Sequence, residues 1–183
     1  MVNSHIKIMF LRSLVVNLSM KMPILTSNGR NILVSRYQTA PEIAGAIVKA
    51  VKESEKDAQK LAPYLKGGNK LASARLIFVF IKNTVPYNKE AGSKQTARTL
   101  ARILNDAHLG GDCKHYATAS AALCKALNIP CKLRLIAQIP NSKVPNHIYC
   151  VAKINGQEVI IDQVLKNFNT EARYNYKYDI NII

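Results

Sequence analysis

The chain has 183 residues, a length that fits one domain of ordinary size with an appended segment. Hydrophobic residues make up 48% of it and charged residues 20%, a globular balance that excludes wholesale disorder. No uncharged stretch approaches the roughly 20 apolar residues of a membrane-spanning helix. The 26 lysines and arginines outnumber the 11 acidic residues, and the resulting charge of +15 bears on partners rather than on fold.

The first 38 residues form a basic segment with five basic and no acidic side chains. Within Ile6 to Leu25, apolar residues recur at helical spacing and predict an amphipathic helix packed on the domain. A cleaved or flexible arm is the alternative. A signal peptide is disfavoured, because Arg12 interrupts the apolar core and no small-residue cleavage site follows. Ile32 to Tyr37 is expected to form a short strand or an extended lead-in.

Four helices are expected next. Thr39 to Glu42 has the spacing of a capping box and opens a helix that closes near Pro63. The second helix, Leu71 to Thr84, is apolar all round in its second half and is expected to be central and buried. A shorter helix covers Thr96 to Asn105. The fourth begins at Asp112-Cys113 after Gly110-Gly111, is rich in small residues and ends near Leu127.

Strands follow the helices. They are predicted at Lys132 to Ile139, Ile148 to Ile154 and Glu158 to Val164, and Asn155-Gly156 is a strong hairpin signal between the last two. Helices followed by strands indicate an α+β fold, with N-terminal helices packed on a C-terminal antiparallel sheet. The predicted division is a basic segment at 1–38, a domain at 39–165, and a tail or edge strand at 166–183.

Cys113 occupies a favourable place for a nucleophile. It follows Gly-Gly-Asp at a predicted helix N-terminus, where the helix dipole and free amides stabilise a thiolate. The glycines let the chain turn sharply and let a substrate approach, and the amide of Cys113 itself is placed to donate to an oxyanion. A buried structural cysteine is the alternative.

His147 and Asp162 supply a candidate base and its partner. Pairing about the Asn155-Gly156 turn gives partner indices that sum to about 311, so His147 faces a position near 164, close to Asp162. Asp162 follows an apolar stretch, where an acid without a partner is costly. A carboxylate beside an imidazole fixes its tautomer and stabilises the imidazolium.

These residues resemble the transglutaminase-like superfamily. Gly110 to Ala117 resembles its nucleophile helix, His147-Ile148-Tyr149 and Ile161-Asp162 resemble its histidine and aspartate strands, and Val85-Pro86-Tyr87 resembles its isoleucine-x-tyrosine stretch. The resemblance covers Leu71 to Val164. It implies a papain-like core and a catalytic triad in which Cys113 is the nucleophile, His147 the base and Asp162 the orienting acid.

The resemblance implies acyl transfer on protein or peptide amides without a cofactor, either as a peptidase or as a transglutaminase-type enzyme. Tyr87, Glu90, Gly92 and Gln95 are similar to a subset of bacterial and tailed-phage members. Gln95 is a candidate to join the amide of Cys113 in an oxyanion hole, and a solvated loop glutamine is the favoured alternative. The chain departs from the family in having no tryptophan before the aspartate, Gln163 where a proline is common, and His115 in place of an acid.

Three alternatives remain beside this interpretation. Zinc could be held by the set Cys113, His115, Cys124, Cys131, His147 and Cys150, but no paired C-x-x-C is present, so no metal site is predicted. The protein could be a catalytically silent structural or virion protein of the same fold. It could also be a polyanion-binding module that uses a contiguous basic face built from the first 38 residues and Leu61 to Leu104.

The four cysteines are expected to be reduced, in a cytoplasmic or virion-associated protein without a membrane span. Apart from Cys113, they are expected to be buried and unreactive.

Overall fold

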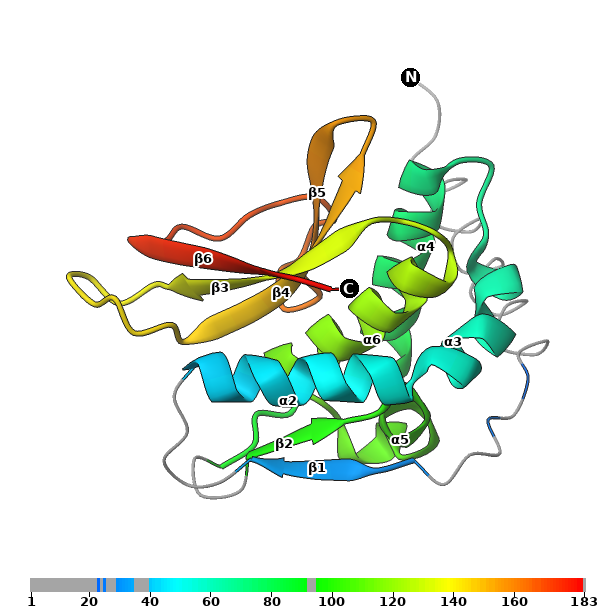
Figure 1. The fold of residues 1–183 in the computed structure, drawn as a ribbon, viewed down its shortest axis with the longest axis horizontal. Helices are drawn as coiled ribbons and strands as arrows, with labels where there is room; N and C mark the ends of the chain where they lie inside the picture. The colour runs from blue at the N-terminus through cyan, green and yellow to red at the C-terminus, as the bar shows by residue number, and fades with distance from the viewer. Residues whose placement is uncertain (1–22, 24, 26–28, 35–39, 92–94, 183) are drawn as a thin grey trace.

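The computed structural model describes residues 23, 25, 29–34, 40–91 and 95–182 (Figure 1). The helix expected within Ile6 to Leu25 and the cap expected at Thr39 therefore lie outside the described residues, apart from 23 and 25 of that helix. The α-helices are α2 (Ala40–Glu53), α3 (Glu55–Leu61), α4 (Lys70–Thr84), α5 (Leu100–Asn105) and α6 (Cys113–Ala126), and two short 3-10 helices cover Ala62–Leu65 and Ala107–Leu109. The strands are β1 (Asn31–Val34), β2 (Gln95–Arg98), β3 (Cys131–Ala137), β4 (His147–Ile154), β5 (Gln157–Ile161) and β6 (Tyr176–Asn181).

The fold is α+β, as the order of elements predicts. The four C-terminal strands form an antiparallel sheet in the order β5-β4-β3-β6, and the helices lie together on one side of it (Figure 1). A separate two-stranded sheet pairs β1 with β2 and lies below α2 in the view of Figure 1. The α6 helix packs directly on β3 and β4 and is surrounded by α2, α3, α4 and α5.

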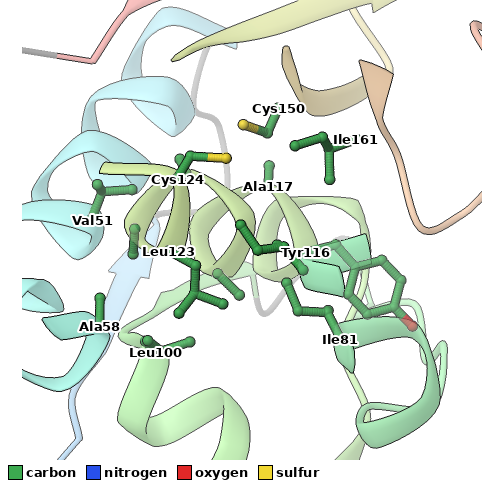
Figure 2. Close-up of a cluster of buried hydrophobic side chains, with 14 of the residues drawn as sticks. Val51, Ala58, Ile81, Leu100, Tyr116, Ala117, Leu123, Cys124, Cys150 and Ile161 are labelled. Carbon is green, nitrogen blue, oxygen red and sulfur yellow. The ribbon is translucent and has the colours of Figure 1, made fainter. Parts of the chain in front are cut away.

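The small residues of α6 explain its central position. Ala117, Ala119, Ala121 and Ala122 are almost completely buried, and Figure 2 shows α6 side chains meeting residues from several other helices and from the sheet. Short side chains let neighbouring backbones approach closely on all sides, so the helix can be covered by both layers at once. The prediction that α4 is the central helix is wrong in part, because Leu76 and Phe80 on its outer face are only half-buried.

Two helix predictions needed correction. The first predicted helix is broken at the buried Ser54, whose hydroxyl donates to the Ala50 carbonyl (2.6 Å) and accepts from the Leu100 amide at the start of α5 (2.8 Å). This back-bonding competes with the helical pattern. The first part of the expected helix over Thr96 to Asn105 is instead the strand β2, because residues 95–98 pair with β1.

The last strand completes the sheet. Arg134 of β3 is 1% exposed and stands opposite Asp179 of β6. Its guanidinium donates to both carboxylate oxygens of Asp179, at 2.8 and 2.9 Å, and to Glu171 at 2.7 Å. A bidentate pair of this kind fixes geometry as well as contributing energy, so it sets the register of this edge strand.

Candidate active site

Cys113 is the first residue of α6 and is half-buried. The preceding Asp112 is the N-cap; its carboxylate accepts from the Lys114 amide (3.2 Å), and the His115 ring nitrogen Nδ1 accepts from the Asp112 amide (3.0 Å). This is a capping box in which histidine takes the position usual for glutamate. The reciprocal bonds fix the helix start, and with it the direction of the Cys113 side chain.

The glycine pair before Asp112 is tied to the loop that follows α4. Gly111 donates to the Pro86 carbonyl and accepts from the Asn88 amide, both at 2.9 Å, so Tyr87 lies alongside it. Gly110 has φ of +69°, and a Cβ there would lie 2.6 Å from the Asn88 Cβ and 2.7 Å from the Pro86 oxygen. Both the backbone angle and the close approach require glycine.

His147 and Asp162 meet at the end of the β4–β5 hairpin. The strands pair with Cys150 opposite Ile161 and Ile154 opposite Gln157, which is the register expected from the Asn155-Gly156 turn. Asp162 is the residue after β5, and its Oδ2 lies 2.7 Å from His147 Nε2. The side chains are 2% and 8% exposed, respectively, so water screens this pair little.

Cys113 and Asp162 both act on the His147 ring. Burial alone would lower the pKa of His147, but hydrogen bonds with Asp162 and Cys113 and the charges of both outweigh it and raise that pKa to about 9. Because Nε2 is bonded to Asp162, Nδ1 is the ring nitrogen left for the sulfur. The structure thus brings the three predicted residues together with His147 in the middle.

The loop that follows Asp162 is held by Lys82 of α4 and Ser120 of α6. Oδ1 of Asp162 accepts from the Val164 amide at 3.1 Å. The ammonium of Lys82 in α4 donates to the carbonyls of Gln163 and Leu165, both at 2.7 Å. The Gln163 amide donates to the Ser120 hydroxyl of α6 at 2.8 Å. Gln163 therefore joins the loop after Asp162 to α6.

A buried polar network lies beneath the start of α6. Glu90 accepts from the Thr96 amide (2.6 Å) and from Arg98 (2.8 Å), and Lys114 lies between Glu90 and Asp112. Burial would raise the pKa of Asp112, but the neighbouring Lys114 ammonium and His115 ring hold it far below its usual value. These ionised groups order the loop beside Cys113.

Gln95 lies in a different arrangement from the one its predicted role needs. Its side-chain amide donates to the carbonyls of Glu90 (3.4 Å) and Ala91 (3.3 Å). A part in an oxyanion hole would require this amide to leave those bonds, so that role stays a prediction. The Cys113 amide is one of the first-turn groups of α6 that have no acceptor within the helix.

Tyr87 belongs to the site, although the residue pattern alone gave it no role there. Burial and the negative charges of Cys113, Asp112 and Asp162 raise the pKa of its phenol, which places it beside these groups. Its ring packs against Tyr116 with centroids 6.2 Å apart, and 53% of the residue is exposed. Its sequence signals were the family-like Val-Pro-Tyr setting and its resemblance, with Glu90, Gly92 and Gln95, to a subset of the family; for Lys82, which lies 80 positions before Asp162, there was none.

The chain is similar in sequence to a known protein family. The sequence pattern of the transglutaminase-like superfamily matches residues 59–163, more than half of the chain. The chain belongs to the transglutaminase-like superfamily. The match begins within α3 and ends one residue after Asp162. No curated protein matches the chain.

Two solved structures resemble this superfamily member. One is described as a putative protease from Parabacteroides distasonis, with 18% identity and a TM-score of 0.55 over 69% of this chain and 27% of its own. The other is described as a putative cysteine protease from Cytophaga hutchinsonii, with 21% identity and a TM-score of 0.46 over 68% and 45%. The chain thus spans less than half the length of either protein, and the first likeness supports the fold.

The structure also bears on the membrane span, the zinc site and the buried cysteines that were considered from the sequence. In the described part of the chain no helix is both long and apolar enough to cross a bilayer. The six residues considered for zinc do not gather, since His147 bonds Asp162 and His115 caps α6, whereas the other three cysteines lie together elsewhere. Cys124 and Cys150 are buried as predicted, but Cys131 is only half-buried.

Proposed function

We propose that the protein is a cysteine-dependent acyl-transfer enzyme acting on protein or peptide amides. Cys113 is the nucleophile, His147 the base and Asp162 the acid that orients it. The observation that carries the proposal is the 2.7 Å contact from Asp162 to His147, whose pKa is raised by hydrogen bonds with both Asp162 and Cys113. This arrangement of nucleophile, base and orienting acid is the triad logic of thiol and serine acyl transfer.

The raised pKa of His147 defines the resting state. At neutral pH a group with a pKa of about 9 is protonated, so His147 is an imidazolium beside the sulfur. Cysteine attacks as a thiolate, and the adjacent positive charge compensates it. The thiolate attacks the amide carbonyl, the imidazolium gives its proton to the leaving nitrogen, and an acyl-enzyme on Cys113 remains.

The second half of the reaction regenerates the thiolate. Neutral His147 takes a proton from water or from an amine as that molecule attacks the acyl carbonyl, and the acyl group leaves Cys113. Water gives hydrolysis and an amine gives transamidation. In both steps the carbonyl oxygen becomes negative, and the Cys113 amide in the first turn of α6 is free of helical bonding to donate to it.

Covalent capture tests the proposal. A peptide carrying a thiol-reactive acyloxymethyl ketone is expected to label the protein once, at Cys113, as read by intact mass and peptide mapping. Labelling is expected to fail in Cys113→Ala and to become much slower in His147→Ala. The matched control is Cys131→Ala, which also removes a partly exposed thiol and is expected to label normally. Equal labelling rates in wild type and His147→Ala would reject the triad.

The second stage of the test follows the product. Casein and a dansylated amine are supplied together, and new amino termini and protein-bound dansyl are measured in parallel. Peptide cleavage without dansyl incorporation indicates a peptidase, and incorporation indicates transamidation. Neither product in the presence of normal Cys113 labelling would favour a catalytically silent protein of this fold.

A further inference from the structure

Three of the four cysteines of the chain converge at a place distinct from the candidate active site. Cys124 lies in the last turn of α6, about 16 Å along the helix from Cys113. The sulfurs of Cys124, Cys131 and Cys150 all lie within 4.8 Å of one another, and Figure 2 shows Cys124 and Cys150 pointing toward each other. Among the described residues, this is the one group of three potential metal ligands brought so close.

The sheet register explains the convergence. Cys131 of β3 pairs with Ala152, and Cys150 precedes Ala152 by two positions on β4. Residues two apart on a strand share a face, so both cysteines point toward the helix layer. There they meet Cys124, which α6 holds against the same two strands. Three separate elements therefore supply one sulfur each.

The ligand set selects for a soft ion. The group contains only sulfur, whereas magnesium and calcium require oxygen ligands. Structural zinc almost always takes four protein ligands, and the described residues bring only these three together. Thiolate ligands suit Cu(I). Three sulfurs that each lie about 2.3 Å from a common ion are about 4 Å apart. The three cysteine sulfurs, which lie within 4.8 Å of one another, therefore need to move only slightly to bind such an ion.

Charge and access favour a monovalent ion. The Cys131 thiol donates to the Ala121 carbonyl of α6 at 3.8 Å, so its sulfur lies against the same helix that carries Cys124. Cys124 and Cys150 are completely buried, and Cys131 is half-buried and provides the contact with solvent. When one of the thiols loses its proton on binding, the thiolate and a monovalent cation leave no net charge in this buried place, which avoids the cost of desolvating an ion.

We propose that Cys124, Cys131 and Cys150 form a binding site for a soft monovalent cation of the Cu(I) class. The ion bonds to all three sulfurs, at least one of them as a thiolate. Any proton that a ligating thiol loses goes to solvent, and the ion keeps its oxidation state. Binding ties the end of α6 to β3 and β4.

The test uses the full chain carrying Cys113→Ala, so that the reactive thiol takes no part. The reduced protein is titrated under anaerobic conditions against the Cu(I) complex of bathocuproine disulfonate, whose visible absorbance falls as the ion is transferred. Transfer of one equivalent, with new ultraviolet thiolate-to-copper absorption, is the expected result. If no Cu(I) is transferred to this protein, the proposal is overturned. This outcome is obtained with Cys124, Cys131 and Cys150 all intact.

Single changes then assign the site. Cys124→Ala, Cys131→Ala and Cys150→Ala are each expected to weaken Cu(I) binding by at least about tenfold, the loss that removal of an outer partner already causes in metal sites. The matched control is Val151→Ala, which removes a buried side chain on the opposite face of β4 and leaves all three sulfurs in place. Unchanged binding in the triple alanine variant would place the ion elsewhere and overturn the assignment.

Discussion

The 2.7 Å contact between His147 Nε2 and Asp162 Oδ2 joins the first residue of β4 to the residue that follows β5. The hairpin between them fixes their separation, so the pair does not depend on a mobile loop. Its consequences are specific: the carboxylate occupies Nε2, leaves Nδ1 for Cys113, and raises the pKa of the ring.

Asp162→Asn is expected to reduce turnover by roughly 10³- to 10⁴-fold while the protein remains folded, because asparagine keeps the shape but removes the charge that stabilises the imidazolium. Asp162→Leu is expected to be more destabilising, because leucine also leaves the Val164 amide, which donates to Oδ1, without an acceptor. Steady-state kinetics and urea unfolding check both. An Asn variant with full activity would contradict the role of this carboxylate.

The pH profile is expected to reflect His147. Because its pKa is about 9 in the folded protein, kcat/KM is expected to fall as pH rises through about 9 and the imidazolium is lost. In Asp162→Asn the alkaline limb is expected to move to lower pH, because a hydrogen bond and a charge that raise this pKa are gone. Ring titration by NMR measures the pKa directly, and a limb that does not move would exclude His147 as its source.

Stability is expected to change in the same pH window. His147 has a higher pKa folded than its ordinary 6.5, so its contribution is fully present below about 6.5 and is lost as pH rises through about 9. The free energy of unfolding is therefore expected to decline from pH 7 to pH 10 more steeply in wild type than in Asp162→Asn. Urea unfolding across this range provides the measurement, and parallel declines would contradict it.

Gly110→Ala is expected to destabilise the protein by more than Gly156→Ala. Both glycines have positive φ, at +69° and +79°, so alanine costs roughly 1–3 kcal/mol of backbone strain at either position. Only at Gly110, which lies three residues before Cys113, would the new Cβ also collide with Asn88 and Pro86. Urea unfolding and the rate of Cys113 labelling separate the two effects. Equal losses at both positions would show that the loop relaxes.

Lys82→Met is expected to lower kcat by up to roughly a hundredfold, because it releases the two carbonyls that hold the loop after Asp162, and small displacements in a triad are costly. The matched control is Lys70→Met, an exposed position at the start of the same helix. Steady-state kinetics distinguishes them. Similar kcat values in both variants would mean that Asp162 keeps its place without Lys82.

Polyanion binding, proposed from the charge of +15, is expected to appear as retention on heparin at about 50 mM salt that is lost as salt rises. Not all of the basic residues counted between 61 and 104 are available, because Lys82 holds two carbonyls and Arg98 and Arg102 pair with Glu90 and Asp106. Removal of residues 1–38 is expected to weaken retention. No retention at low salt would leave the charge as a determinant of solubility.

The sequence alone determined the parts of this protein that rest on local rules. Asn155-Gly156 fixes a two-residue turn, and a turn of known length sets the pairing of every later residue in the hairpin, which is why Asp162 could be placed near His147. The small residues of α6 and the glycines before Cys113 likewise predicted a closely packed helix with a reactive N-terminus. The fold class followed from the order of helices and strands.

Tertiary contacts decided the remainder, because they join residues whose separation in sequence carries no pattern. Ser54 breaks a helix by bonding to Leu100, β2 becomes a strand only beside β1, and Lys82 reaches the loop of Asp162 from α4. The three cysteines illustrate the same limit. Each taken alone reads as a small apolar residue, and only the packing of α6 on β3 and β4 brings their sulfurs within 4.8 Å.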